Sequence, residues 1–245
     1  MKKIFYLSAL SVLLVSAAMA DGVCPSPTPG TATIASYFGI TSCHIGNLDF
    51  SNFFFGSTAG GGANPLSGSQ IGVTTVTGTT GSGIPFEGFA FAPISGLSVS
   101  SPGTIDVQVG FTVTPVAGSG VTLEDLGISF NGSATGSGTT NFTESWCFAN
   151  ESVPTCIASG TAGDFKVTNP PSHLTDDVVF PSPVSAITVL KDVLVNTGSS
   201  AGTAAISAFG NTFSYTPVPE PVYTTMLAAG LLGLGWMRKR RQSRG

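Results

Sequence analysis

Hydrophobic and polar residues alternate along the middle of the chain, which is the pattern of a β-strand with one buried face. The clearest example is residues 104–114, where Ile, Val and Phe occupy every second position and mostly polar residues lie between them. No stretch within residues 21–216 keeps a helical hydrophobic period over three turns. The pattern therefore predicts an all-β body whose sheets bury one face and expose the other.

Eight further segments are predicted as strands, because clusters of glycine, proline, serine and asparagine separate short apolar runs. These segments are residues 31–38, 48–55, 71–77, 86–91, 121–130, 165–168, 184–195 and 204–215. Residues 123–126 are ambiguous and are also compatible with a single turn, and the Gly-rich residues 56–70 are expected to be a flexible loop. We expect a single β-sandwich, of jelly-roll or immunoglobulin-like type, with about 8–10 strands.

Composition narrows the possible functions. Charged residues make up 9% of the 245 residues, against about 25% in an ordinary soluble domain. Glycine, serine and threonine are abundant instead, which excludes a coiled coil or helical bundle. Residues 21–216 contain twelve acidic side chains, the two lysines Lys166 and Lys191, and no arginine. Such an acidic body repels phosphate backbones, so we expect no nucleic-acid partner.

Residues 1–20 have the three parts of a secretory signal peptide. Two lysines follow the initiator Met, residues 4–15 are apolar but too short to span a bilayer, and a small-x-small sequence ends at Ala20. We therefore predict export through the secretion machinery and cleavage by signal peptidase between Ala20 and Asp21. The alternative is an uncleaved anchor or a hydrophobic first strand.

Residues 217–245 form a second predicted targeting segment, at the C-terminal side of the body. A stiff proline segment precedes the uncharged apolar run at residues 222–237, which is predicted to be a transmembrane helix. A buried core helix is disfavoured because the run has no polar face. Basic residues follow the run and should remain cytoplasmic, which leaves the body outside. This membrane-orienting cluster consists of Arg238, Lys239, Arg240 and Arg241.

The order of these three parts at the C-terminal end resembles the PEP-CTERM sorting tail of bacterial exported proteins. The resemblance rests on Pro219, Glu220 and Pro221, the Gly/Ala/Leu-rich helix and the arginine cluster. It implies recognition of the PEP motif by an exosortase-type membrane transpeptidase, which would carry out the cleavage itself. The resemblance also implies anchoring in the membrane before processing, and then a place at the cell surface or outside the cell. The body resembles the uncharacterised β-rich bodies of such proteins, to which no activity is attached.

Four cysteines lie in the predicted exported body. In an oxidising compartment four thiols suggest two disulfides. Three pairings are possible, and we favour the pairing that is local in sequence, Cys24–Cys43 and Cys147–Cys156. Free buried thiols are the alternative. A metal site is disfavoured because the spacings are not C-x-x-C.

No set of residues in the sequence converges on catalysis, and we expect neither an enzyme nor a cofactor. Ser200 lies in a G-x-S-x-G match, but no histidine follows it as that hydrolase arrangement requires. His44 and His173 each have acidic neighbours, which is common by chance. The acidic pairs at residues 124–125 and 176–177, taken as loop residues, lack the spacing of a calcium loop, so no metal ligand is assigned.

The sequence leaves three hypotheses for the body. The first is a structural or adhesive role at the cell surface or in an extracellular polysaccharide matrix. The second is a glycan-binding module, with or without assistance from calcium, for which Tyr37, Trp146 and Tyr215 are the rings that could stack on sugars. The third is a hydrolase that uses His44 or His173.

Overall fold

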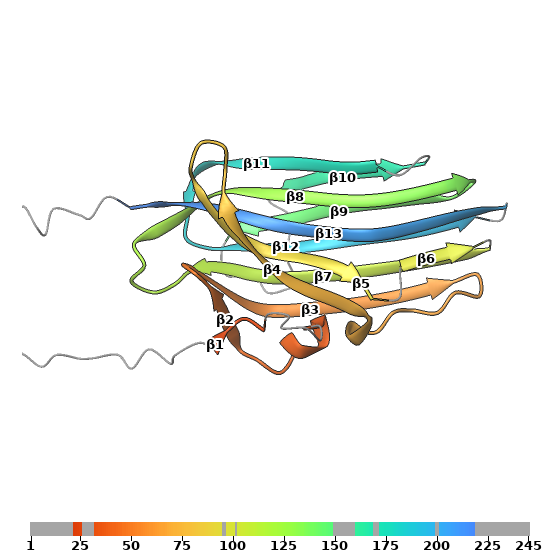
Figure 1. Cartoon of the computed structure of the whole chain (residues 1–245), viewed down its shortest axis with the longest axis horizontal. Coiled ribbons are helices and arrows are strands. Elements are labelled where there is room, and N and C mark those ends of the chain that lie inside the picture. Colours follow the sequence, from red (N-terminus) through yellow and green to blue (C-terminus); the bar gives the residue numbers. More distant parts are fainter. Residues whose placement is uncertain are drawn as a thin grey trace, which may run out of the picture.

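The protein folds as a two-layer β structure. The computed structural model describes residues 22–25, 32–94, 97–100, 102–148, 160–168, 172–198 and 201–218. In this part of the chain thirteen strands form two sheets, and the long strands run side by side along the long axis of the molecule (Figure 1). The predicted all-β class and two-sheet sandwich are confirmed.

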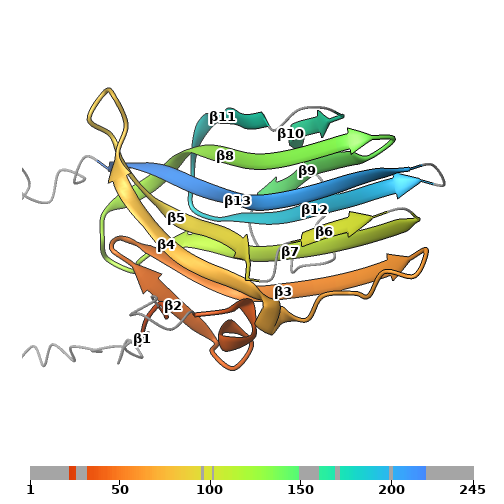
Figure 2. The same cartoon turned by 45° about the vertical axis from the view of Figure 1, so that its right-hand side comes forward.

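One sheet has seven strands and the other has six. The labelled strands of both sheets can be followed in Figure 2. The seven-stranded sheet contains, in spatial order, β1 (Gly22–Val23), β2 (Ser42–Ile45), β3 (Leu48–Gly60), β7 (Gly103–Pro115), β12 (Ile187–Gly198), β9 (Thr139–Phe148) and β10 (Gly160–Val167). The six-stranded sheet contains β11 (Ser172–Val184), β8 (Val121–Gly136), β13 (Gly202–Pro217), β5 (Pro85–Pro93) and β4 (Ile71–Thr79), while β6 (Leu97–Ser100) also pairs with β13.

Both sheets are almost entirely antiparallel. The exception among the described ladders is the short parallel pairing of β1 with β2. The chain changes sheet seven times among these strands: between β3 and β4, β6 and β7, β7 and β8, β8 and β9, β10 and β11, β11 and β12, and β12 and β13. Segments far apart in the sequence are therefore brought together across the interior.

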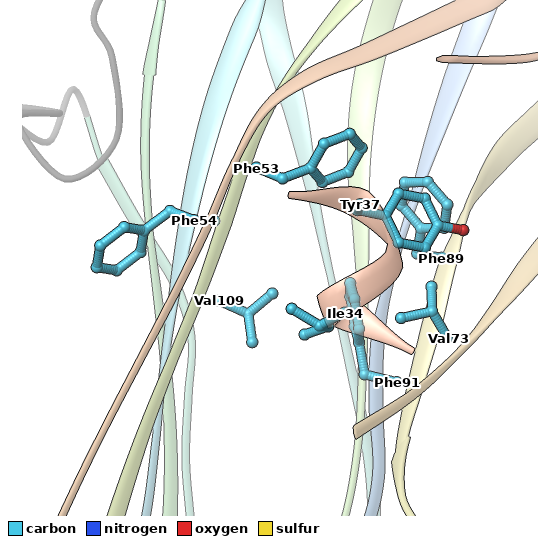
Figure 3. A pocket seen from close by; sticks show the side chains of 9 residues that line it. Ile34, Tyr37, Phe53, Phe54, Val73, Phe89, Phe91 and Val109 are labelled. Atoms are coloured by element: carbon cyan, nitrogen blue, oxygen red, sulfur yellow. The ribbon is translucent and has the colours of Figure 1, made fainter. Parts of the chain in front are cut away.

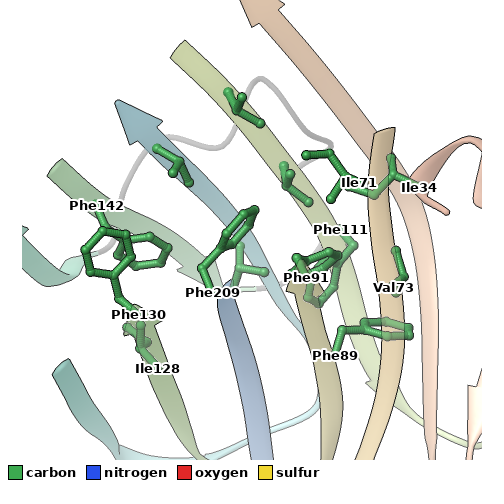
Figure 4. Close-up of a cluster of buried hydrophobic side chains, with 14 of the residues drawn as sticks. Ile34, Ile71, Val73, Phe89, Phe91, Phe111, Ile128, Phe130, Phe142 and Phe209 are labelled. Atoms are coloured by element: carbon green, nitrogen blue, oxygen red, sulfur yellow. The ribbon is translucent and has the colours of Figure 1, made fainter. Parts of the chain in front are cut away.

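The core fills the space between the sheets and is rich in phenylalanine (Figure 4). Phe89 and Phe111 come from opposite sheets, and their ring centroids lie 5.5 Å apart in an edge-to-face arrangement. Phe91 and Phe209 stack on neighbouring strands at 5.2 Å. Each buried ring stabilises the fold by about 1.5–3 kcal/mol through removal of apolar surface from water.

One strand prediction was wrong, and one ambiguous segment is settled as strand. Residues 31–38 were predicted as a strand, but the described part of this segment holds the 3₁₀-helix η1 (Ile34–Tyr37). Ile34 and Tyr37 lie three residues apart, so one turn of 3₁₀-helix buries both side chains on the same face. Residues 123–126 form no turn; they belong to β8, which pairs with β11 and β13.

The predicted flexible loop at residues 56–70 is also largely ordered structure. β3 continues to Gly60, and the 3₁₀-helix η2 (Gly68–Gln70) leads into β4. Five strands, namely β1, β2, β6, β9 and β11, were not predicted, which raises the strand number above the predicted range.

The disulfide Cys24–Cys43 is confirmed, with Cα atoms 4.6 Å apart, and it fastens β1 to β2. Cys147 is disulfide-bonded as well, while Cys156 lies outside the described residues. The same holds for the predicted signal peptide, the cleavage point Ala20/Asp21, the PEP motif, the apolar run and the basic cluster. Within the residues that are described, no helix has the length and apolarity needed to cross a bilayer.

Candidate functional site

The outer face of the six-stranded sheet carries an open trough. It has a volume of about 320 Å³ and runs across the strands from β4 to β11. The side chains that define it come from five neighbouring strands. They are Val76 on β4, Ala90 on β5, Thr212 on β13, Ser129 on β8, and Thr175 and Asp177 on β11.

The trough exists because the strand register aligns small residues. One row across the sheet runs from Val76 through Gly88, Thr212 and Gly127 to Asp177. The next row repeats this pattern with Ala90, Gly210 and Ser129 in its centre. Residues of a row point to the same face of the sheet, so the short side chains form a floor and the longer ones form two walls.

The glycines of the floor have no room for a side chain. A Cβ atom on Gly88 would overlap the carbonyl oxygen of Asn211, and one on Gly210 would lie 2.6 Å from the carbonyl oxygen of Phe89. A Cβ on Gly127 would lie 2.6 Å from Thr212 Oγ1 and 3.0 Å from Asp177 Oδ1. A hydroxyl group and a carboxylate therefore converge directly above Gly127.

Among the described residues that line the trough, the charged side chain is acidic. Asp177 is exposed in the wall, and the described body has two lysines. Lys166 is exposed on β10 of the other sheet, and Lys191 is fully buried. In the trough, Asp177 can accept hydrogen bonds and the hydroxyl groups can both donate and accept them. The described residues that line it include no lysine or arginine that could pair with an anionic ligand.

A second hollow lies inside the core, between η1 and the two sheets (Figure 3). Its volume is about 10 Å³, and Ile34, Tyr37, Phe89 and Phe91 are among the apolar residues around it. A space of this size is at the lower limit for one water molecule. We interpret it as a packing gap rather than a ligand site.

The three rings that the sequence offered for stacking on sugars belong to the core. Tyr37, Trp146 and Tyr215 are 2%, 9% and 5% exposed. Burial raises the pKa of Tyr37 far above its ordinary value, and the Tyr37 hydroxyl donates to the carbonyl oxygen of Pro25 at 2.6 Å. A glycan site built on these rings is therefore ruled out.

The two histidines lie on different sheets and do not meet. His44 on β2 is paired with Asp49 in the ladder to β3. His173 on β11 lies with its Nδ1 atom 2.5 Å from Asn131 Oδ1, on the same outer face as the trough. Ser200 lies outside the described residues.

The acidic pairs are in strands and not in loops, which corrects the sequence-based interpretation. Residues 124–125 belong to β8 and residues 176–177 to β11. Asp177 lies in the trough wall, whereas Asp176, as its neighbour in a strand, points to the other face. Among the residues that the structure describes, no three His, Cys, Asp or Glu side chains are grouped in a way that could hold a metal ion.

A buried carboxylate connects the two sheets at one end. Glu87 on β5 accepts the Tyr215 hydroxyl at 2.6 Å, the backbone N–H of Leu48 at 3.1 Å and that of Asn47 at 3.0 Å. The Asn47 amide also donates to the Tyr215 hydroxyl at 3.1 Å. Burial is the main cause that raises the pKa of Tyr215, and its bond to Glu87 raises it further.

A second polar cluster lies in the middle of the core. Lys191 on β12, Glu144 on β9 and Asn211 on β13 are 0%, 0% and 2% exposed. Burial raises the pKa of Glu144 and lowers that of Lys191, and their mutual attraction opposes both shifts.

Sequence reasoning missed this cluster, although the alternation pattern contained a signal. Each of the three residues occupies an apolar position of its strand: Lys191 between Val189 and Val193, Glu144 between Phe142 and Trp146, and Asn211 between Phe209 and Phe213. A polar residue at the centre of an apolar alternation is buried in the sheet interior, and it requires a partner there.

Comparison with known proteins leaves the family open. No protein-family model matches the chain, and no curated protein matches it. One similar solved structure is the enzymatically active domain of tailspike protein 4 of bacteriophage CBA120, with 15% identity and a TM-score of 0.27 over 68% of this chain. The match spans only 19% of that tailspike domain.

Two other similar structures are carbohydrate-binding modules. TmCBM61, solved with β-1,4-galactotriose, matches at 7% identity and a TM-score of 0.31, over 66% of this chain and 88% of its own. The family 11 module from Clostridium thermocellum, solved with a mixed-linked tetrasaccharide, matches at 15% identity and a TM-score of 0.22, over 64% and 87%. Likenesses at this level are too low to bear on function, so the trough and the buried cluster are interpreted from their own chemistry.

Proposed function

We propose that the protein is an exported bacterial surface or matrix protein whose β-sandwich adheres to neutral polysaccharide through the trough of the six-stranded sheet. The observation that carries the proposal is the row of small residues that hollows this face between Val76 and Asp177. Its role would be adhesive and non-catalytic.

The polar side chains of the trough suit a polyhydroxylated ligand. The hydroxyl groups of Ser129, Thr175 and Thr212 can each donate and accept, and Asp177 accepts two or more hydrogen bonds. A sugar chain presents the same mixture of donors and acceptors along its length. The trough is open to solvent, so an extended chain can lie in it without threading.

Charge favours neutral polymers over acidic ones. The body carries a large excess of acidic side chains, and Asp177 lines the trough itself. Uronate, sulfate and phosphate groups would meet repulsion that no neighbouring cation offsets. We therefore expect a preference for uncharged glucans, galactans or mannans.

Native affinity electrophoresis in gels containing soluble neutral polysaccharides tests this proposal. We expect the wild-type protein to be retarded by at least one neutral polymer and by none of the acidic ones. Thr212→Phe should abolish the retardation, because its ring would occupy the space above Gly88 and Gly127. The matched control is Thr203→Phe, an exposed position on the same face of β13. No retardation by any neutral polymer would leave a purely structural role. Equal retardation of Thr212→Phe would mean that polysaccharide binds outside the trough, and either result overturns the proposal.

Delivery to the surface is part of the proposal and rests on the sequence. The signal peptide would direct export, and the tail with Pro219, Glu220 and Pro221 would hold the precursor in the membrane until an exosortase-type transpeptidase cuts it. The masses of the native protein from membrane and extracellular fractions test this step. A released form that begins at Asp21 and ends near the PEP motif supports it, whereas a chain that reaches Gly245 in every fraction contradicts it.

A further inference from the structure

Three reactive side chains meet where the two sheets face each other. Lys191 and Glu144 are direct cross-strand partners on β12 and β9 of the seven-stranded sheet. Asn211 projects between Phe209 and Phe213 from β13 of the opposite sheet. None of the three has a role in the trough chemistry proposed above, since their side chains are buried.

One carboxyl group holds the amine and the amide together. Glu144 Oε2 lies 3.5 Å from Lys191 Nζ and 2.9 Å from Asn211 Nδ2, and Asn211 Nδ2 also lies 2.8 Å from Glu144 Oε1. Lys191 Nζ sits 4.4 Å above the ring of Phe111 and 5.7 Å from that of Phe91. The amine is thus confined between a carboxyl group and two aromatic faces.

The hydrogen bonding of this cluster is incomplete for an ordinary buried ion pair. Asn211 Oδ1 and Lys191 Nζ are both buried without a hydrogen bond of good geometry. Buried polar atoms normally have partners, and each one that does not is costly. Rotation of the Asn211 amide exchanges its oxygen and nitrogen, and Glu144 in its acid form would then donate to that oxygen.

The core environment favours the uncharged forms of the pair. Burial lowers the pKa of the Lys191 ammonium and raises that of the Glu144 carboxyl group. A neutral amine has a free electron pair and is a nucleophile, whereas an ammonium group is not. A neutral carboxyl group can act first as an acid and then as a base.

We propose that Lys191 and Asn211 form an intramolecular isopeptide bond, with Glu144 as the acid and base of the reaction. Lys191 Nζ attacks Asn211 Cγ, and Glu144 transfers its proton to Oδ1. The Glu144 carboxylate then takes one proton from Nζ and passes it to Nδ2. The bond between Cγ and Nδ2 breaks, ammonia leaves, and the proton on Oδ1 returns to Glu144. The reaction is a transamidation, so it needs no oxidant or cofactor.

The fold supplies what this slow reaction requires. The strands hold the amine and the amide next to one carboxyl group, which replaces a bimolecular encounter by a fixed arrangement. The phenylalanine shell excludes water, so the amide is exposed to the amine and not to hydrolysis. The product would join β12 to β13 and therefore one sheet to the other.

Peptide mass spectrometry of the mature wild-type protein tests the proposal directly. The body contains two sites for trypsin, Lys166 and Lys191. In reduced and denatured protein we expect cleavage after Lys166 but not after Lys191, because an acylated lysine is not a trypsin site. Fragmentation should place a link between Lys191 and Asn211 that has lost one ammonia. Peptide sequencing is needed because Asn131-Gly132 can also lose ammonia by cyclising.

Variants separate the chemistry from folding. Glu144→Gln and Lys191→Met should each restore the full mass, and Glu144→Gln should also restore cleavage after Lys191. The matched control is Glu87→Gln, which alters the other buried carboxylate and should leave the link intact. The wild-type result decides even if a variant fails to fold. An unmodified Asn211 and complete cleavage after Lys191 in the wild type would overturn the proposal, as would a link that survives in Glu144→Gln.

Discussion

Replacing Glu87 by glutamine should destabilise the fold more than any surface change of the same kind. Glu87 is buried, and its two oxygens accept from the backbone of Asn47 and Leu48 and from the hydroxyl of Tyr215. The substitution keeps the shape but converts one acceptor oxygen into a donor NH₂ group. The donors around it cannot turn away, because two of them are backbone N–H groups at the Gly46–Asn47 turn.

The cost follows from which donor loses its acceptor. If the glutamine oxygen faces Asn47 and Leu48, the NH₂ group meets the Tyr215 hydroxyl, which already accepts from the Asn47 side chain at 3.1 Å. In the opposite orientation the NH₂ group meets the two backbone N–H groups. Either way at least one buried donor is left unpaired, at about 1–3 kcal/mol for each, and the remaining bonds lose their charge assistance. We expect a total of about 2–4 kcal/mol.

Urea unfolding with the disulfides intact, monitored by tryptophan fluorescence, measures this loss of stability. We expect a lower urea concentration at the midpoint and an unchanged dependence of the free energy on urea concentration. Tyr215→Phe removes one donor and should cost about 1–2 kcal/mol. Glu124→Gln is the matched control, because Glu124 is half-buried and its one described bond is accepted from Thr216 Oγ1, which a glutamine oxygen can replace. A Glu87→Gln variant as stable as Glu124→Gln, or more stable than Tyr215→Phe, would refute this reasoning.

Three further changes test other parts of the structure. Burial, reinforced by a neighbouring carboxylate, raises the pKa of Asp106 to about 6. The contribution of Asp106 to stability is therefore complete below about pH 4, and it is lost as the pH rises through the raised pKa. Asp106→Asn should consequently match the wild type in thermal unfolding at pH 4 and exceed it at pH 7.5, and the reverse order would contradict this sign. Gly46→Ala should lower the free energy of unfolding by more than about 2 kcal/mol, because the new Cβ atom would overlap Glu87 Oε1; about 1–2 kcal/mol of this loss comes from backbone strain. The control is Gly62→Ala, which is also at positive φ but in open space and should show the loss from strain alone. Phe89→Ala empties the centre of the aromatic cluster and should cost about 3–5 kcal/mol in urea unfolding; a loss below 1 kcal/mol would show that the core collapses around the gap.

Alternation predicted the strands that bury a continuous apolar face, and it failed where polar residues enter the core. β7 has Val107, Val109 and Phe111 in regular alternation and was predicted within a residue at each end. β9 was overlooked because Glu144 and Thr140 occupy its buried positions and interrupt the apolar pattern.

The trough could not be predicted, because it depends on register between strands. Gly88, Thr212 and Gly127 are distant in sequence, and only the pairing of β5, β13 and β8 aligns them. Composition did indicate abundant glycine and hydroxyl residues, but it could not say that they gather on one face. Likewise, Lys191 and Glu144 gave no sign of pairing until β12 and β9 were placed side by side.

The place of β13 in its sheet determines how the domain bears mechanical load. This strand is hydrogen-bonded to β8 along one side from Gly202 to Pro217, and to β6 and β5 along the other. Its ladder bonds lie perpendicular to the strand, so tension applied at Pro217 along the strand axis shears many of them together. A strand at the edge of a sheet would instead peel away bond by bond. A domain held through this end should therefore resist unfolding under the steady pull of flowing liquid far better than its modest size would suggest.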